Sequence, residues 1–312
     1  MNPFWSKKRV CVTGGAGFLG RLLCARLEQE DCADIFIPRR VDYDLTDARA
    51  AERLLRDARP DIVIHLAAEV GGIGANQQHP GRFFYANMAM GLHLIEEARK
   101  RDIEKFVQIG TVCAYPKHCP VPFRERDLWN GFPEETNAPY GIAKRALATM
   151  LEAYRTQYGF NGIFLLPVNL YGPGDNFDLE TSHVIPAMIR KFCHAIEQGE
   201  SRIECWGSGQ VSREFLYVDD AVEGILTAAV VHNDPQPVNL GTGREIKISD
   251  LADLIARLTG FDGRIVWNTD YPNGQPRRRL DTSRAKALLN WRARIDLEEG
   301  LRRTIAWWRD SK

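Results

Sequence analysis

A tyrosine and a lysine stand four positions apart, at Tyr140 and Lys144, and share one face if the segment is helical. A tyrosine has an unperturbed pKa of about 10 and gives up its proton poorly at neutral pH. An ammonium group beside the phenol favours the phenolate, so the pair suits acid or base catalysis. The same ammonium can hydrogen-bond a nicotinamide ribose. Such pairs are common by chance, but this one follows a glycine-rich segment by about 120 residues, which favours a catalytic role.

The glycine-rich segment runs from Thr13 to Gly20, after a short apolar stretch and before residues with helical spacing. Glycines allow a tight turn and a close approach of the backbone to a ligand. The N-terminus of the following helix presents free N–H groups to a pyrophosphate. This context favours a dinucleotide-binding loop over a plain glycine-rich turn. The predicted loop residues are Gly14, Gly15, Gly17, Phe18, Leu19 and Gly20.

The choice between NAD and NADP depends on the end of the second predicted strand. An NAD site usually has an acidic residue there, about 20 residues past the loop, that binds the ribose 2′-hydroxyl. This sequence has Ile37-Pro38-Arg39-Arg40 instead, with two guanidinium groups and no carboxylate. Because guanidinium groups attract and grip a phosphate, we expect NADP(H), with Arg40 at the 2′-phosphate; NAD(H) is the alternative. Asp44 and Leu45 are expected near the adenine.

A hydroxyl and a thiol follow the fourth predicted strand, at Thr111 and Cys113. In parallel sheets, ligands bind at the carboxyl ends of the strands, so the Thr111 hydroxyl can hold a substrate carbonyl oxygen. Thiols form thiolates more readily beside positive charge, which makes Cys113 a candidate proton acceptor. The alternative interpretation of this cysteine is a small side chain buried in the core.

These residues must be positioned by an α/β fold, because apolar stretches of strand length alternate with segments of helical spacing over the first half of the chain. The alternation predicts a doubly wound parallel Rossmann sheet with helices on both faces. The predicted strands cover residues 9–13, 34–37, 62–66, 105–109 and 162–167, and the predicted helices cover residues 18–30, 48–57, 83–101 and 140–158.

The alternation breaks after about residue 169, where segments become shorter and glycine and proline cluster. We expect a dinucleotide-binding domain over residues 1–168 and a smaller α/β substrate lobe over residues 169–312, with the chain crossing between them. Further helices are expected near Ala187, Ala221, Ser249, Ser283 and Leu297.

Composition excludes several classes of function. The 312 residues include 41 basic and 41 acidic side chains, so no global positive field favours nucleic acid. No apolar run approaches the roughly 20 residues of a membrane span, and we expect no signal peptide, because no apolar stretch of signal-peptide length precedes the glycine-rich segment. The seven cysteines are scattered without metal-ligand spacing, so we expect reduced thiols, no metal site and a cytoplasmic protein.

Longer motifs give the chain a family resemblance. Through Gly14–Gly20 and Tyr140/Lys144 it resembles the extended short-chain dehydrogenase/reductases, and within these it is similar over nearly its whole length to the GDP-L-fucose synthase family. The more particular motifs are Ala67-Ala68-Glu69-Val70-Gly71-Gly72-Ile73, Cys113-Ala114-Tyr115-Pro116-Lys117, Asn169-Leu170-Tyr171-Gly172-Pro173, Ser182-His183-Val184-Ile185-Pro186, Arg213-Glu214-Phe215-Leu216-Tyr217 and Asn273-Gly274-Gln275-Pro276-Arg277.

The resemblance implies an NADPH-dependent enzyme that epimerises C3 and C5 of a GDP-4-keto-6-deoxyhexose and then reduces its 4-ketone. In that family pattern Cys113 is the base and His183 the acid of the epimerisation. Thr111 and Tyr140 hold the ketone oxygen. Tyr140 also donates the proton in the reduction, with Lys144 supporting it.

The resemblance also implies ligand contacts and a homodimer. Cofactor contacts are expected at Ala67, Pro167, Asn169 and Leu170, and substrate contacts at Lys191, Trp206, Arg213 and Asn273. Three positions depart from the family pattern: Thr111 replaces a serine, Ala16 replaces an arginine that some members have near the cofactor phosphate, and Asn273 replaces a frequent aspartate.

Two other functions stay open at the level of sequence. One is a related nucleotide-sugar reductase or epimerase that acts on another sugar, such as a GDP-heptose, and performs only one of the two steps. The other is a catalytically silent NADP-binding sensor. Such sensors commonly lose the tyrosine or the lysine, and both are present here.

Overall fold

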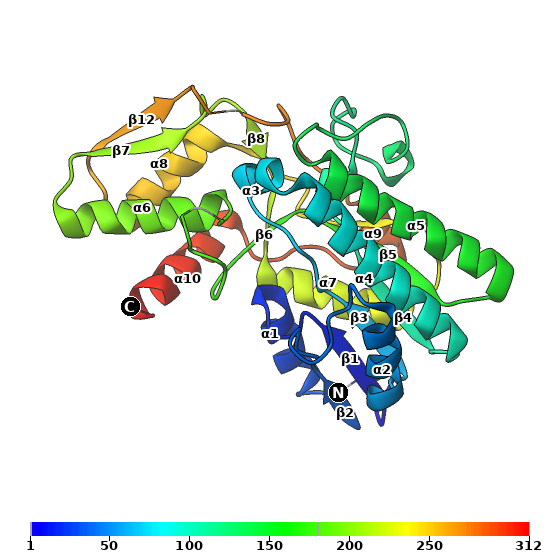
Figure 1. Ribbon diagram of the computed structural model, residues 1–312. Coiled ribbons are helices and arrows are strands. Elements are labelled where there is room, and N and C mark those ends of the chain that lie inside the picture. The colour runs from blue at the N-terminus through cyan, green and yellow to red at the C-terminus, as the bar shows by residue number, and fades with distance from the viewer. Residues whose placement is uncertain (1, 180, 272, 312) are drawn as a thin grey trace.

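In the computed structural model, which describes residues 2–179, 181–271 and 273–311, six strands of the described chain form one parallel sheet (Figure 1). Their order is β10-β5-β4-β3-β1-β2, so the chain moves to one side of β1 for β2 and then returns to its other side for β3. The strands are β1 (Arg9–Thr13), β2 (Asp34–Phe36), β3 (Ile62–His65), β4 (Lys105–Ile109), β5 (Gly162–Pro167) and β10 (Val238–Leu240).

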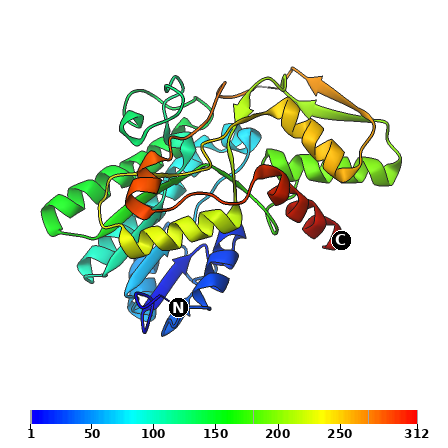
Figure 2. The ribbon, with the colours of Figure 1, turned by 180° about the vertical axis from the view of Figure 1, so that it is seen from behind.

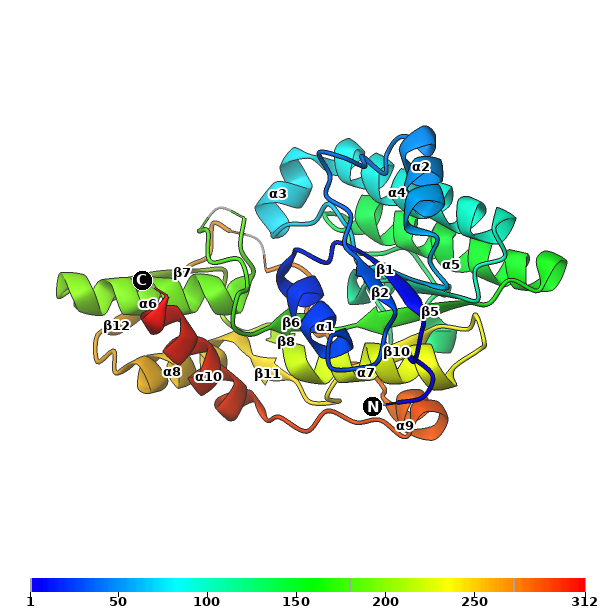
Figure 3. The same ribbon diagram turned by 90° about the horizontal axis from the view of Figure 1, so that it is seen from below.

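Helices cover both faces of this sheet, and Figure 3 shows the two helical layers with the strands between them. The central strands β3, β4 and β5 are therefore buried along their whole length and consist largely of apolar residues. One face carries α1 (Phe18–Leu27), α7 (Val218–Val231) and α9 (Ser283–Leu289); the other carries α2 (Ala48–Ala58), α4 (Pro80–Lys100) and α5 (Ala138–Tyr158), with the short α3 (Ile73–Gln78) leading into α4.

A smaller group of elements with its own apolar core lies to one side of the sheet (Figure 2). Two parallel strands pack there against helices, and two further strand pairs connect this group to the sheet. The elements are α6 (Val184–Gln198), α8 (Ile248–Thr259), α10 (Leu297–Asp310), β7 (Arg202–Trp206) paired with β12 (Arg264–Asn268), β6 (Asn169–Tyr171) paired with β9 (Phe215–Tyr217), and β8 (Ser212–Arg213) paired with β11 (Ile246–Lys247).

The predicted fold class is confirmed, and β1, β4 and β5 have the predicted bounds. Two helix bounds were wrong by three residues, and the remaining helix bounds differ from the predicted ones by two residues or fewer. Helix α1 ends at Leu27 and not at residue 30, because the amides of Gln29 and Glu30 bond carbonyls three residues back in a tighter turn. Helix α4 begins three residues earlier than predicted, at Pro80, because a proline at the first helical position loses no intrahelical hydrogen bond.

The boundary near residue 168 stays a prediction, and the chain crosses it more than once. Strand β10 pairs with β5 at the edge of the large sheet, and α7 packs on α1. Residues from the second half of the chain therefore form part of the large sheet and of the helical layer on one of its faces. Residues 273–281 then run back across the junction, where Phe123 and Leu280 form a β-bridge.

A buried carboxylate joins three of these crossing segments. Glu214, between β8 and β9, is inaccessible to solvent. One of its carboxylate oxygens accepts hydrogen bonds from the amides of Thr242 (2.5 Å) and Gly243 (2.7 Å), and the other accepts from the amide of Leu280 (2.6 Å). These bonds satisfy backbone donors that have no access to water.

Replacing this carboxylate tests its structural role. Glu214→Ala is expected to lower the free energy of unfolding by about 3 kcal/mol, because it leaves buried amide donors unpaired. Urea unfolding followed by circular dichroism measures the change. The control is Glu223→Ala on α7, whose half-exposed carboxylate lies 3.6 Å from Arg26 and is expected to change stability by less than about 0.5 kcal/mol. Equal stabilities of the two variants would contradict the role.

Candidate active site

The glycine-rich loop lies between β1 and α1, at the carboxyl edge of the sheet. Gly14 has a φ of +72°, and a Cβ there would lie 2.7 Å from the backbone nitrogen of Ala67. A Cβ on Gly20 would lie 2.2 Å from the carbonyl oxygen of Gly14. The first turn of α1 receives no side-chain cap from Gly17. The loop therefore has both the close backbone packing and the free helix N-terminus that a pyrophosphate requires.

An arginine pair shares one carboxylate at the end of β2. Arg40, predicted to bind the 2′-phosphate, has a guanidinium nitrogen 3.2 Å from Glu69, and its side chain is 64% exposed. Arg82 on α4 makes two hydrogen bonds to the same carboxylate, of 2.8 and 2.6 Å. Sequence reasoning missed Arg82, because only the packing of α4 brings it beside Arg40. Two guanidinium groups thus lie where an extra phosphate of NADP is expected.

The adenine contacts expected at the next turn stay predictions. Asp44 accepts hydrogen bonds from the amide and the hydroxyl of Thr46, and these lower its pKa. Leu45 is buried at the edge of the sheet core. Of the other predicted cofactor contacts, Pro167 ends β5, and Asn169 and Leu170 begin β6 at the same edge of the sheet.

Thr111, Cys113 and Tyr140 lie together at the end of β4. The Thr111 side chain caps a short 3₁₀ helix (Val112–Ala114) by accepting a 3.1 Å hydrogen bond from the amide of Cys113. Burial raises the pKa of Tyr140, the neighbouring Cys113 adds to the rise, and a hydrogen bond with the Thr111 hydroxyl partly offsets it. The phenol therefore holds its proton at neutral pH.

Gly141 is what allows α5 to approach this loop. A Cβ at that position would lie 2.7 Å from the carbonyl oxygen of Cys113, so any larger residue would push the helix away. One turn further on, the side chain of Lys144 is buried, and its Nζ lies 5.9 Å from the centroid of the Tyr140 ring. Burial lowers the pKa of Lys144 to about 8.

His183 is the residue before the first turn of α6, and it reaches the same region from the smaller group of elements. Burial lowers its pKa, and the positive charge of Arg278 lowers it further. Arg278 also places Nη1 3.5 Å from the Sγ of Cys113. Arg278 thus contacts the predicted base and adds positive charge near the predicted acid.

Sequence reasoning missed Arg278, although the motif that ends at Arg277 borders it. Three consecutive arginines follow Pro276, and the sequence does not say which one turns inward. In the structure Arg277 is exposed and pairs with Glu245, whereas Arg278 is only 6% exposed.

The four predicted substrate contacts divide into two clusters. Arg213 is near Cys113 and Arg278 and donates a 3.0 Å hydrogen bond to the backbone oxygen of Asn273, whose side chain in turn accepts from Ser208. Trp206 is 52% exposed and stacks on Tyr271 with ring centroids 4.1 Å apart. The Nζ of Lys191 lies 5.6 Å from the centroid of the Trp206 ring. An exposed aromatic platform with an adjacent cation therefore lies on α6 and β7.

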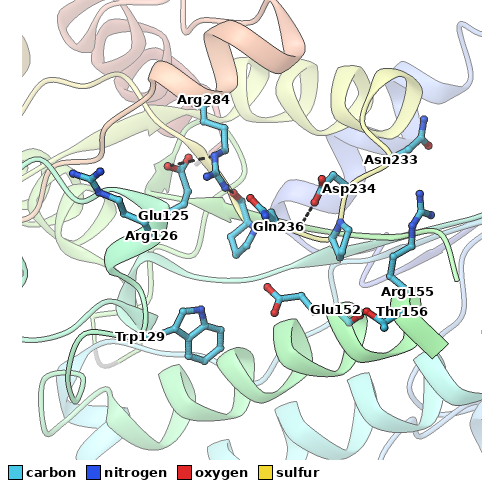
Figure 4. A pocket seen from close by; sticks show the side chains of 12 residues that line it. Glu125, Arg126, Trp129, Glu152, Arg155, Thr156, Asn233, Asp234, Gln236 and Arg284 are labelled. Atoms are coloured by element: carbon cyan, nitrogen blue, oxygen red, sulfur yellow. Dashed lines mark hydrogen bonds and ion pairs between the residues drawn. The ribbon is translucent and has the colours of Figure 1, made fainter. Parts of the chain in front are cut away.

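A separate hollow of about 590 Å³ lies between α5 and the loop before β10, and Figure 4 shows its mixed charges. Arg126, Arg155 and Arg284 alternate there with Glu125, Glu152 and Asp234, beside Trp129. The predicted catalytic and cofactor residues do not line it.

Within residues 2–179, 181–271 and 273–311, no three His, Cys, Asp or Glu side chains are grouped so that they could hold a metal ion. None of the helices in these ranges combines the length and the apolarity that crossing a bilayer requires.

Comparison with known proteins agrees with this geometry. Residues 10–241 match the model of the NAD dependent epimerase/dehydratase family. The chain belongs to this family. A GDP-L-fucose synthase of Sinorhizobium fredii is 40% identical over 94% of this chain and 93% of its own length. The GDP-L-fucose synthase of Escherichia coli is 39% identical over 98% of both chains.

A solved structure extends the match to three dimensions. The GDP-L-fucose synthetase from Naegleria fowleri bound to NADP is 26% identical and superposes with a TM-score of 0.88, over 98% of this chain and 95% of that one. These matches confirm the predicted resemblance to extended short-chain dehydrogenase/reductases and to the GDP-L-fucose synthase family.

The burial of the Lys144 ammonium is expected to lower the free energy of unfolding. In the described chain its Nζ has no carboxylate or hydrogen-bond partner, and its pKa falls from 10.5 to about 8 on folding. Below pH 8 the ammonium must be buried in its charged form, so Lys144→Met is expected to raise the free energy of unfolding at pH 7 by about 3 kcal/mol.

The pH dependence separates this effect from simple packing. As the pH rises above 8 the folded protein releases the proton, so the gain is expected to shrink and to vanish towards pH 10.5. Urea unfolding of both proteins at pH 7 and pH 10 measures it. A gain of equal size at both pH values would contradict a buried ammonium at this position.

Proposed function

We propose that this protein is an NADPH-dependent enzyme that epimerises C3 and C5 of a GDP-4-keto-6-deoxyhexose and reduces its 4-ketone, as a GDP-L-fucose synthase does. The observation that carries the proposal is the Cys113 thiol beside the Tyr140 phenol and 3.5 Å from Arg278, whose positive charge also acts on His183. A reductase needs only the tyrosine and the lysine. A thiol and an imidazole around the same point give the site the acid and base that an epimerisation needs.

Relatives that align with nearly the whole chain support both the substrate class and the cofactor. The two bacterial relatives of about 40% identity are GDP-L-fucose synthases, and the solved structure from Naegleria fowleri is a GDP-L-fucose synthetase bound to NADP. The tight loop at Gly14 and Gly20 and the guanidinium groups of Arg40 and Arg82 fit that cofactor.

In the epimerisation, the 4-ketone acidifies the protons on C3 and C5. Cys113 as thiolate takes one of these protons, and the electron pair of the broken C–H bond passes into an enolate. The Thr111 hydroxyl and the Tyr140 phenol stabilise the enolate oxygen. His183 then returns a proton to the opposite face of the ring.

In the reduction, the same two hydroxyl groups hold the ketone oxygen. NADPH, when bound at the glycine-rich loop, supplies the hydride that C4 accepts. Tyr140 gives its proton to the oxygen, and its raised pKa keeps that proton available at neutral pH. Lys144 holds the cofactor ribose and stabilises the phenolate that remains.

The diphosphate of a nucleotide sugar suits the charge of this site. Arg213 is largely buried, and burial, followed by the positive charge of Arg278, lowers its pKa to about 9. A diphosphate beside Arg213 favours its charged form. The exposed rings of Trp206 and Tyr271 offer a flat surface for the base.

The assembly and the compartment belong to the same proposal. Helices α4 and α5 pack side by side, and α4 leaves Phe84, Tyr85 and Leu92 between 39% and 55% exposed. We assign this helical layer as a homodimer contact, since exposed apolar side chains of this size gather at interfaces. All seven cysteines are free thiols, as expected for a cytoplasmic protein.

A substrate panel tests the function. The purified protein is incubated with GDP-, dTDP- and UDP-linked 4-keto sugars and with NADPH or NADH, in D₂O, and the products are identified. The expected product comes from the GDP-4-keto-6-deoxyhexose with NADPH, reduced at C4 and labelled at C3 and C5. Reduction without label would remove the epimerase step and leave a simple reductase, such as one acting on a GDP-heptose.

Substitution of the base separates the two steps. Cys113→Ser is expected to slow deuterium exchange at C3 and C5 by about 100-fold or more, because a hydroxyl is a far weaker base than a thiolate. Reduction of an already epimerised 4-ketone is expected to continue. The control is Cys119→Ser, six residues on, whose thiol has its pKa raised to about 12 by burial. Exchange at the wild-type rate in Cys113→Ser would make Cys113 a packing residue only.

A further inference from the structure

Arg278 is held in place by a neighbouring side chain that also fixes the catalytic loop. Its Nε lies 3.3 Å from the Oε1 of Gln275, and the amide of Gln275 donates 3.0 Å hydrogen bonds to the carbonyl oxygens of Pro116 and Lys117. Gln275 is only 3% exposed. The loop that follows Cys113 and the guanidinium that reaches its sulfur are therefore connected through one buried amide.

The charge of Arg278 is not neutralised by a carboxylate. Among the described residues it forms no ion pair, whereas its chain neighbour Arg277 pairs with Glu245. A buried guanidinium without a counter-ion has a strong interaction with any anion that forms beside it. The Sγ of Cys113 lies 3.5 Å from Nη1 and becomes such an anion when the thiol loses its proton.

The other groups around the thiol do not oppose this interaction. Cys113 faces the phenol of Tyr140 on α5, which is uncharged at neutral pH, and the guanidinium of Arg213 on β8. Glu134 contributes negative charge at Arg213. His183, the residue before α6, interacts electrostatically with Arg278. The net charge next to the sulfur is positive.

We propose that Arg278 is a positioning residue for the epimerisation, one that holds Cys113 as a thiolate and aims it at the substrate, and that it has little part in hydride transfer. This inference rests on the proposed function. In the step that it assists, an S–H bond forms as the C3–H or C5–H bond breaks, and the C–H electron pair enters the enolate. His183 then gives its N–H proton to the opposite face, where the enolate pair forms the new C–H bond.

The test uses the full-length protein as Arg278→Gln, with Arg278→Lys as the variant that keeps the charge and Arg277→Gln as the matched control. Alkylation of Cys113 by iodoacetamide, followed by peptide mass spectrometry over a range of pH, reports the thiolate without any substrate. Deuterium exchange at C3 and C5 at saturating substrate reports the epimerisation. Reduction of a pre-epimerised 4-ketone by NADPH reports the second reaction.

Arg278→Gln is expected to slow both alkylation and exchange at pH 7 by about tenfold or more, and to move both profiles towards higher pH. Arg278→Lys is expected to recover part of the lost alkylation and exchange rates, and Arg277→Gln is expected to change neither rate. The rate of 4-ketone reduction by all three variants is expected to stay within about threefold of the wild-type rate. Arg278→Met serves as the neutral variant where circular dichroism shows that Arg278→Gln does not fold.

The inference would be overturned if the pH profiles of alkylation and exchange were the same in the neutral variant and in the wild type. An equal loss of exchange and of reduction, with a raised KM and unchanged alkylation, would also overturn it and make Arg278 a substrate-binding residue. Absence of exchange in the wild type would instead overturn the proposed function, and the alkylation profile would still decide whether Arg278 holds the thiolate.

Discussion

The contact of α5 with the loop after β4 is the constraint on which the candidate site depends. At Gly141 the helix backbone packs directly on the carbonyl of Cys113, where a single Cβ would lie 2.7 Å away. This approach brings the Tyr140 phenol to the Thr111 hydroxyl and the Cys113 thiol. In the proposed function, a ketone oxygen held between the two hydroxyl groups has the base on the same loop, so one oxygen-binding point would serve both reactions.

Positive charge is the second feature that organises the site. Lys144, Arg213 and Arg278 are buried or largely buried, and the described residues offer none of them a carboxylate in an ion pair. Burying cations in this way opposes folding, because each loses hydration without a compensating partner. The same arrangement stabilises the anions of the proposed reaction: the thiolate, the enolate, the phenolate and a diphosphate.

Two groups of elements supply the site, and their relative position is held by buried polar contacts. The sheet and α5 contribute Thr111, Cys113, Tyr140 and Lys144, whereas His183, Arg213 and Arg278 come from the second half of the chain. Glu214 bonds the amides of residues 242, 243 and 280, and Gln275 bonds the carbonyls of residues 116 and 117. These directional bonds fix the distance between the groups more tightly than apolar contact alone.

The sequence by itself determined whatever depends on neighbours within a few residues. The glycine spacing of residues 14–20, the Tyr140/Lys144 pair and the strands at 9–13, 105–109 and 162–167 follow from local patterns, because turns, helix faces and buried strands have short periods. It also placed Cys113 and His183 in the family pattern. Only the tertiary structure decided that Arg278 and not Arg277 turns inward, that Arg82 joins Arg40, and that β10 returns to the edge of the sheet. These contacts join residues far apart in the chain, and no local period records which of several equivalent side chains the packing will bury.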